Sequence, residues 1–544
     1  MIKLDPFPGS SGRNILRNIL RNILPLILLL SALSYFRGLN GNFVFDDNVL
    51  IKNDNFYMSE SNPLKCWDRG FWADGRGGLY RPMTTFSYWL NAKASGMDSS
   101  SFRIVNLLLH IAVSCLLYVV ASKIIPGRIY GALAALLYAV HPLHSEAVVP
   151  AFGRAELLCA FFFLLAFLLH ISRGSVFKTY VLPGFFFLLS LWSKEHAIAF
   201  IPVCLLYDIV FKNSSRKTML IKYSTYLVFF GIFCLSRYSA LHSVFPGKDI
   251  NEAIIDNQLA LCPFPERVVS AVRIQGMAIW KSVWPATLSH DYSYAQILPS
   301  RSIFDPYAML TLLVFAGIPL LLGMLYPKKR RIIIFLTLAY ALCVIPAGNF
   351  IIPAGTIFAE RLFYLPTVWS CTFASLAIVI LTRKLPRMST ILLIVLIVGA
   401  FAFRTNMRCY DWHDRMSLAL AGIKTSPMSV KTWGNLAVQF EESGQYINAL
   451  AASDKAIQIL PDDSSLYLRR GTYFTRLDMN NEAERDFKKA LSLNPKNQQA
   501  EINLAIVLAN TGRVDEAREI LRIMLLKEPS LKAATEMLGA LDKK

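Results

Sequence analysis

The chain has 544 residues, of which 54% are hydrophobic, and it carries a formal net charge of +19. This length exceeds one ordinary domain, and so apolar a composition is typical of a polytopic membrane protein and argues against one large soluble core. The positive residues fall in short clusters between apolar runs, which indicates loops that set membrane orientation and argues against nucleic-acid binding.

Eleven apolar runs approach the roughly 17–25 residues that a helix needs to cross a bilayer. They lie at about 20–36, 104–122, 129–147, 155–171, 177–193, 196–211, 219–236, 306–326, 331–348, 362–382 and 388–404. Arg17 and Arg21 interrupt the first run, which we interpret as an uncleaved anchor in preference to a signal peptide. The stretch 268–285 is interrupted by Arg273 and Lys281, which favours an interfacial or re-entrant helix.

If eleven spans alternate, six basic clusters fall on one side, and this side is expected to be the inner one. The clusters are Arg13, Arg17 and Arg21; Lys123 and Arg128; Arg173 and Lys178; Lys212, Arg216 and Lys217; Lys328 to Arg331; and Arg383, Lys384 and Arg387. The loops 37–103 and 237–305 then lie outside, as does everything from about 424 onward. We expect a multispan membrane domain over 1–410, a linker over 411–429 and a soluble domain over 430–544.

The C-terminal part repeats with a period of 34 residues. The first copy has Trp433, Leu436, Ala437, Phe440, Ala449, Ala456 and Pro461; the second has Tyr467, Arg470, Gly471, Phe474, Ala483, Ala490 and Pro495; the third has Glu501, Leu504, Ala505, Leu508, Ala517, Met524 and Pro529. This pattern resembles the tetratricopeptide repeat, whose paired helices pack through small residues and end at a proline. It predicts three repeats and a partial capping helix over 532–544, and thus an all-α chain. Arg470 replaces the usual leucine and is expected to weaken the second copy slightly.

Polar motifs gather in the loops assigned to the outer side. They are Asp46-Asp47 and Tyr80-Arg81-Pro82 in the first loop, His141 to Glu146 and Gly153 to Glu156 in the second, Lys194-Glu195 in the third, Trp284 to Tyr294 in the fourth, and Glu360 to Pro366 in the fifth. Charged residues beside membrane spans are costly and mark functional sites. Their convergence on one face predicts an active site at the membrane surface.

Several of these segments together resemble a known family. In chain order they are F-V-F-D-D, Y-R-P-M-T-T-F-S-Y, V-N-L-L-L-H, H-P-L-H-S-E-A-V, G-R-A-E-L-L, S-K-E-H, A-E-R-L-F-Y-L-P and the tandem repeats. This order resembles the transmembrane and tetratricopeptide-repeat-containing proteins, which are similar to protein O-mannosyltransferases within the GT-C class of membrane glycosyltransferases. The resemblance covers nearly the whole chain. It implies transfer of mannose or a similar hexose from a polyprenyl- or dolichyl-phosphate donor to a serine or threonine hydroxyl of a protein acceptor.

Two adjacent carboxylates, Asp46 and Asp47, are the candidate catalytic groups. A hydroxyl that attacks an anomeric carbon needs a base to accept its proton, and neighbouring carboxylates tend to have different pKa values. By its place in the family motif Asp46 is expected to be the base, with Asp47 orienting it or holding a metal. A turn or helix-cap role for the pair is the structural alternative.

Three arginines, Arg81, Arg154 and Arg361, are candidates for binding the donor phosphate, because the guanidinium fork matches phosphate oxygens. Each could instead reach toward lipid headgroups as an interfacial arginine. Supporting roles are expected for Glu156, Lys194, Glu195, Glu360 and Tyr364, which would fix the arginines or line the entrance of a span.

His141, His144 and Glu146 form a candidate divalent-metal site, because His-x-x-His spacing places two rings on one face of a helix. Pro142 disfavours a continuous helix there, so structural hydrogen bonding near the catalytic loop is the favoured interpretation. No cofactor is required by any other pattern. His290, Asp291 and Tyr292 are candidates for contact with the acceptor.

Two alternatives to the glycosyltransferase remain at this point. The first is a cell-envelope oligosaccharide ligase or polymerase, for which the long loop 237–305 would carry the key charges. The second is a non-enzymatic membrane scaffold in which the repeats bind a partner. Replacing Asp46 and Asp47 separates the enzyme from the scaffold, because only the enzyme would lose activity.

Overall fold

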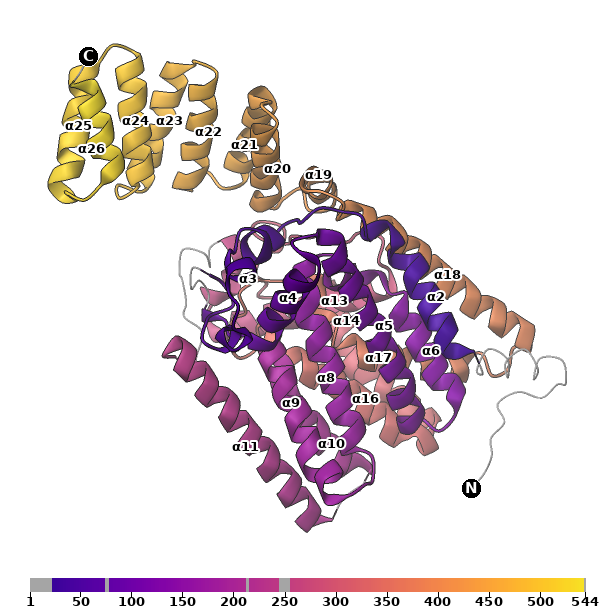
Figure 1. The fold of residues 1–544 in the computed structure, drawn as a ribbon. Coiled ribbons are helices and arrows are strands. Elements are labelled where there is room, and N and C mark those ends of the chain that lie inside the picture. Colours follow the sequence, from indigo (N-terminus) through magenta and orange to yellow (C-terminus); the bar gives the residue numbers. More distant parts are fainter. Residues whose placement is uncertain (1–21, 74–77, 212–214, 244–254, 543–544) are drawn as a thin grey trace. The chain divides into compact units, whose positions relative to one another are not determined.

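The structure is a computed structural model that describes residues 22–73, 78–211, 215–243 and 255–542 (Figure 1). Contacts divide the chain into two compact units, one made of residues up to 290 and 299–418, the other of 291–298 and 419–544. No strand occurs among the described residues, so the predicted all-α class is confirmed. The arginines of the N-terminal basic cluster, and Lys212, lie outside the described residues.

Each predicted span of the first unit coincides with helical structure. The helices are α2 (Ile23–Tyr35), α5 (Ser99–Ile124), α6 (Arg128–Ala139), α8 (Arg154–His170), α9 (Leu182–Ser193), α10 (Phe200–Phe211), α11 (Arg216–Leu241), α14 and α15 (Pro306–Leu312 and Ile318–Leu325, joined by a helical turn), α16 (Arg330–Val344), α17 (Thr367–Leu381) and α18 (Arg387–Asp411). Apolar periodicity therefore located the helices.

The number of membrane crossings is a separate question from the number of helices. Six described helical segments are long and apolar enough to cross a bilayer: Ser99–Ile124, Ala151–His170, Arg216–Leu241, Pro306–Leu325, Pro327–Ala347 and Arg387–Asp411. Ile23–Gly38, Arg128–Ala139 and Thr367–Leu381 are apolar but shorter. The count of eleven spans and the orientation that follows from it thus stay predictions.

Two helices illustrate how the apolar sequence is used. Beyond Arg154 and Glu156 in its first turn, helix α8 is almost entirely apolar, and most of its side chains are buried between neighbours that include α5 and α9. Phe161, Leu165 and Leu168 form one half-buried stripe. Helix α11 instead buries only Lys222, Tyr226, Phe233 and Arg237, which form one stripe along the helix. Its other faces expose large aliphatic side chains such as Leu227 and Leu235, as expected of a helix that faces lipid.

The interrupted stretch 268–285 forms helix α13, Phe264–Val283, which packs against α14. A Cβ atom added at Gly276 would lie 1.8 Å from the carbonyl oxygen of Tyr307, so only glycine allows this close approach. The helix buries small and polar residues and exposes Trp280 and Val283. Its placement at the membrane interface stays a prediction.

The repeat array of the second unit is confirmed. The helix pairs are α20 and α21 (Val430–Glu442 and Tyr446–Ile459), α22 and α23 (Ser464–Arg476 and Asn480–Leu493), and α24 and α25 (Gln498–Asn510 and Val514–Lys527), followed by α26 (Lys532–Leu541) (Figure 1). Gly471 shows why the pattern needs small residues, because an added Cβ would lie 2.7 Å from the Phe487 ring of the paired helix.

The expected weakening at Arg470 has a compensation that the sequence pattern did not show. Its guanidinium binds Asp486 through Nε and Nη2 at 2.7 and 2.8 Å, and Nη1 binds Asp454 at 2.7 Å. The group also lies over the rings of Tyr467 and Phe474. Arg470 therefore joins α21, α22 and α23 by charged hydrogen bonds where the other copies place a buried leucine.

The second unit also contains a short piece of the long fourth loop, residues 291–298. The Ala295 amide donates to the Met428 carbonyl and the Val430 amide donates to the Tyr294 carbonyl, each at 2.7 Å. The Ser429 hydroxyl, at the N-cap of α20, donates to Asp291 at 2.7 Å. The predicted linker 411–429, helical over Arg415–Thr425 (α19), thus ends in a segment that pairs with this loop.

Candidate functional site

The two adjacent aspartates have different surroundings because the chain turns sharply before them. Phe45 has a φ of 50°, a left-handed conformation that is uncommon for a residue with a side chain. Asp47 is fully buried and accepts hydrogen bonds from the backbone amides of Phe152 (2.7 Å), Ala151 (3.2 Å) and Val44 (3.3 Å). Asp47 therefore fastens the F-V-F-D-D segment to the turn at Ala151–Gly153.

This environment also perturbs the acidity of Asp47. Burial disfavours the charged carboxylate, whereas the three amides and the Arg103 guanidinium favour it, and the net effect raises the pKa of Asp47 to about 6. All of its hydrogen bonds are to backbone groups of the protein. The side chain is thus committed to structure and does not face an open space.

Asp46, in contrast, is half-buried and lies near Arg361. Burial opposes the charge of Arg361, but the carboxylates of Glu146 and Asp46 outweigh it, so the pKa of the guanidinium lies above its ordinary value. Arg361 binds Glu146 twice, through Nη1 and through its backbone amide at 3.0 Å. Its guanidinium also lies 5.1 Å from the centre of the Phe152 ring, whose own backbone amide binds Asp47.

A second ion pair forms between Glu156, near the start of α8, and Lys194. Glu156 is 1% exposed, and Lys194 is 7% exposed. Burial lowers the pKa of Lys194, although Glu156 opposes this effect. The other oxygen of Glu156 lies 3.2 Å from Nε2 of His196, so one carboxylate lies between a lysine and a histidine.

The third pair joins Arg81, the residue before α4 (Pro82–Ser95), to Glu195. Nη2 and Nε of Arg81 bind Glu195 Oε2 at 3.0 and 3.1 Å, and the guanidinium lies over the Phe71 ring. Burial opposes ionisation of Glu195, but Arg81 outweighs it and lowers the pKa of this carboxyl. Thr84 binds the backbone of Ser193 at 3.0 Å, which ties the start of α4 to the same turn.

These three pairs interact with one another. Lys194 interacts electrostatically with Arg81 and Arg361, and Arg361 interacts electrostatically with Asp46 and Glu156. We call this set the charged cluster; its members are Asp46, Arg81, Glu146, Glu156, Lys194, Glu195, His196 and Arg361. It brings together one candidate base, three cations and the carboxylates that pair with them, of which Glu146 and Glu156 are buried and Glu195 is partly exposed.

Three other predicted residues lie outside the charged cluster. Arg154 is fully buried and donates to Asn106, Asn91 and the carbonyls of Ser87 and Phe102, which commits its guanidinium to joining α4, α5 and α8.

Glu360 accepts the Ser289 amide at 2.7 Å and lies 3.9 Å from Arg408, so it holds the fourth loop. Tyr364 donates or accepts at His110 Nδ1 (2.8 Å) in the buried core. Arg154, Glu360 and Tyr364 thus have contacts that position other parts of the fold.

The candidate metal site is not formed. Within the described residues no three His, Cys, Asp or Glu side chains are grouped so as to hold a metal ion. His144 uses its ring nitrogens on the Tyr138 carbonyl (3.0 Å) and the Thr367 hydroxyl (2.7 Å), and Glu146 binds Arg361. Pro142 breaks the helix between the histidines, as His141 accepts the Leu143 amide in a turn.

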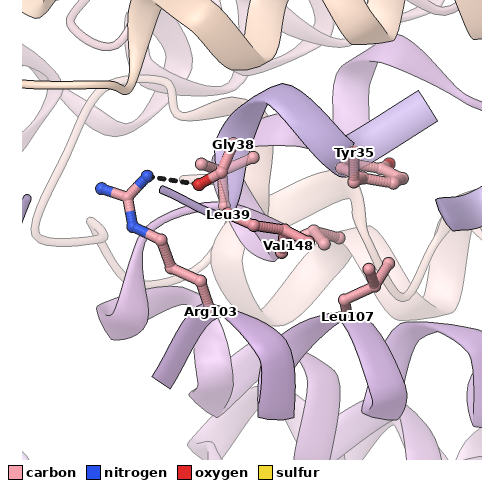
Figure 2. Close-up of a pocket in the computed structure, with 7 residues that line it drawn as sticks. Tyr35, Gly38, Leu39, Arg103, Leu107 and Val148 are labelled. Carbon is pink, nitrogen blue, oxygen red and sulfur yellow. Dashed lines mark hydrogen bonds between the residues drawn. The ribbon is translucent and has the colours of Figure 1, made fainter. Parts of the chain in front are cut away.

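Arg103 and His196 were not assigned from the sequence. Arg103 donates to the carbonyl of Gly38 at 2.6 Å (Figure 2). It also donates to the carbonyls of Asn42 and Trp412 (3.0 Å), and thereby holds the segment that leads to Asp46. The gap around it, lined by residues that include Tyr35 and Leu107, has no room for a water molecule and is not a binding pocket. His196 follows Lys194-Glu195 directly, and the S-K-E-H motif was the available signal.

Comparison with known proteins supports the predicted resemblance. A tetratricopeptide repeat model matches residues 478–540. Protein O-mannosyl-transferase TMTC3 of Mus musculus is 27% identical over 94% of this chain and 60% of its own length. Protein O-mannosyl-transferase TMTC1 of Homo sapiens is 29% identical over 81% of this chain and 55% of its own, and protein O-mannosyl-transferase F38B6.6 of Caenorhabditis elegans is 27% identical over 77% and 60%.

The chain spans about 60% of the length of the first two curated relatives, so their whole activity is not transferred by similarity alone. The resemblance to transmembrane and tetratricopeptide-repeat-containing O-mannosyltransferases is nevertheless confirmed over most of this chain. Among solved structures, an Arabidopsis OM64 TPR domain shares 24% identity over 21% of this chain with a TM-score of 0.20, which is too low to support any argument.

Proposed function

We propose that this chain is a membrane glycosyltransferase that moves mannose, or a similar hexose, from a polyprenyl- or dolichyl-phosphate donor to a serine or threonine hydroxyl of a protein. The names of its relatives support the reaction class. The single observation that carries the proposal is that Asp46 interacts electrostatically with Arg361, while the carboxylate of the adjacent Asp47 accepts backbone hydrogen bonds.

In the proposed reaction Asp46 is the general base. The acceptor oxygen forms a bond to the anomeric carbon, its proton passes to Asp46, and the bond between that carbon and the phosphate oxygen breaks. The lipid phosphate leaves with the electron pair and one additional negative charge. Asp47 acts as a positioning residue, because its bonds to Ala151 and Phe152 fix the turn that presents Asp46.

The leaving phosphate needs positive charge close to where its negative charge develops. Arg361 is the first candidate, since its side chain is 20% exposed and lies near Asp46. Lys194 and Arg81 are the second and third. Each of the three cations is paired with a carboxylate in this structure. The donor phosphate would therefore replace a carboxylate as the partner of the cation that it binds.

The remaining parts of the proposal follow the predicted topology. The charged cluster and the repeat unit would lie on the outer side of a bacterial inner membrane or the lumenal side of the ER membrane. The repeat array would bind the acceptor protein or a partner, since such arrays present extended surfaces to peptides. The apolar helices would hold the lipid tail of the donor in the bilayer.

The test is sugar transfer from mannosyl phosphate on a polyprenyl chain by membranes that carry the full chain. Asp46→Asn is expected to lower the transfer rate by about 10²–10⁴. The matched control is Asp68→Asn, because Asp68 lies in the same loop, is largely exposed and forms a surface ion pair with Lys65. Transfer that survives Asp46→Asn unchanged would refute the catalytic assignment and favour the scaffold.

A further inference from the structure

We infer that Glu156 and His196 form a proton-accepting pair that takes up one proton when the donor phosphate binds to Lys194. This inference rests on the proposed function. It deepens that function by assigning His196 as a positioning residue that controls the charge of the donor site.

The geometry of the pair is unusual for buried polar groups. Oε2 of Glu156 and Nε2 of His196 lie 3.2 Å apart, and neither atom has a hydrogen-bond partner among the described residues. Glu156 is 1% exposed and His196 is 6% exposed. Buried polar atoms are nearly always paired, so two such atoms 3.2 Å apart with no hydrogen bond indicate a place where a proton can be added.

The other oxygen of Glu156 already has a strong partner. Oε1 binds Nζ of Lys194, so the carboxylate lies between a cation and a neutral imidazole. In this arrangement Lys194 supplies the positive charge that the buried carboxylate of Glu156 requires. His196 therefore does not have to carry a second positive charge.

The charges that face this pair come from several elements. They are Lys194 and Glu195 beside His196, Arg81 before α4, Arg361 in the turn Glu360–Phe363, Glu146 in the turn Ser145–Val148, and Asp46, with the thiols of Cys159 (α8) and Cys343 (α16) on helices that pack nearby. The charged cluster that contains this pair therefore holds three cations and four carboxylates. Adding an anionic phosphate makes this region more negative by at least one charge.

Donor binding must therefore change the state of Glu156. When the ammonium group of Lys194 binds the phosphate oxygens, the carboxylate of Glu156 loses the cation that compensates its charge. An uncompensated buried carboxylate is strongly disfavoured. One proton from solvent, placed between Oε2 and Nε2, restores the balance. The count is the same whether the proton stays on the imidazole or on the carboxyl, because the two atoms share it.

The test counts protons during binding. The probe is mannosyl phosphate on a short polyprenyl chain, a phosphodiester that does not itself titrate near neutrality. Calorimetric binding to the full chain in detergent at pH 7.5, in buffers of different ionisation enthalpy, is expected to give uptake of about one proton per donor. The observed affinity would then fall about tenfold for each unit of rising pH.

Glu156→Gln is expected to bind the probe with uptake near zero, because this variant has no carboxylate that must be compensated. His196→Gln is expected to bind the probe with less uptake than the native chain at pH 7.5, because Glu156 then lacks the imidazole that shares the proton. The matched control is His413→Gln, because His413 is 42% exposed at its side chain and pairs with Asp414 outside the charged cluster. Binding to the native chain without proton uptake would overturn this inference while leaving the proposed function intact. Failure of the native chain to bind the probe would overturn the proposed function, and the inference with it.

Discussion

The carboxylate of Asp47 accepts a hydrogen bond from the backbone amide of Phe152 at 2.7 Å, across 105 residues of sequence. This contact separates the roles of two adjacent acidic residues. Asp47 stabilises the turn that holds both residues, and Asp46 is close enough to Arg361 for their charges to interact. The paired motif is thus one structural carboxylate and one candidate base.

Replacing Asp47 is therefore expected to lower the stability of the fold, because this residue has a structural role. Asp47→Asn keeps one acceptor oxygen for Phe152 but leaves the amides of Ala151 and Val44 facing an NH₂ group, at a cost of about 1–3 kcal/mol for each unsatisfied amide. Thermal unfolding of the purified chain in detergent measures this loss. Asp46→Asn in the same assay should unfold at the native temperature, and an equal loss in both variants would contradict the division of roles.

Asp47 also predicts a specific dependence of stability on pH. Its pKa is raised from 3.8 to about 6 in the folded protein, so the folded state holds this proton more tightly than the unfolded state. The contribution is fully present below about pH 4 and is lost as the pH rises through about 6, with a total of roughly 3 kcal/mol. The free energy of unfolding of the native chain, minus that of Asp47→Asn, should therefore fall between pH 4 and pH 7 in measured unfolding curves. A difference that stays constant over this range would contradict the raised pKa of Asp47.

The pair of Arg361 and Glu146 offers a test by double substitution. Arg361→Gln leaves a fully buried Glu146 without its cation, which is expected to cost about 3–5 kcal/mol of stability. Adding Glu146→Gln removes the stranded charge and should restore most of that loss, as measured by thermal unfolding. Sugar transfer should remain low in both variants, because neither offers Arg361 to the donor phosphate. A double variant as unstable as Arg361→Gln would contradict the ion pair.

Arg470 should stabilise the second repeat although it departs from the repeat pattern. Arg470→Leu restores the residue found at Leu436 and Leu504 but leaves Asp486, which is 6% exposed, without its bidentate partner. We expect a loss of about 1–3 kcal/mol in unfolding of the repeat unit by urea. Arg469→Leu is the control, since this neighbouring arginine on the same helix is exposed. A gain in stability for Arg470→Leu would show that the repeat pattern outweighs the ion pairs.

The sequence predicted the positions of the helices because apolar runs and the 34-residue period are local properties of the chain. It did not predict where several helices end. The run at 129–147 is one continuous α-helix only to Ala139, since His141 and Pro142 begin a hydrogen-bonded turn before helical structure resumes at Ser145. The run at 196–211 becomes an α-helix only at Phe200. Such ends depend on polar contacts with distant segments, which hydropathy does not record.

The site was predicted in composition more fully than in arrangement. Asp46, Arg361, Lys194 and their partners come together as the motifs indicated. The different roles of Asp46 and Asp47 depend on the amides of residues 151 and 152. The rings of His141 and His144 make hydrogen bonds within the fold that the spacing of the motif did not reveal. Arg154 looked like Arg361 in sequence, and only its four buried acceptors distinguish the two.

The pairing of residues 291–298 with the start of α20 has a consequence for biosynthesis. The ribosome makes Gln296 before Met428, its partner 132 positions later, so this part of the loop has no partner while α14 to α18 are synthesised. The first repeat can acquire its full set of contacts only after those helices have emerged. A fragment that begins at residue 419 would lack this segment, so expression of the repeats alone should include 291–298 as a covalently joined or added peptide.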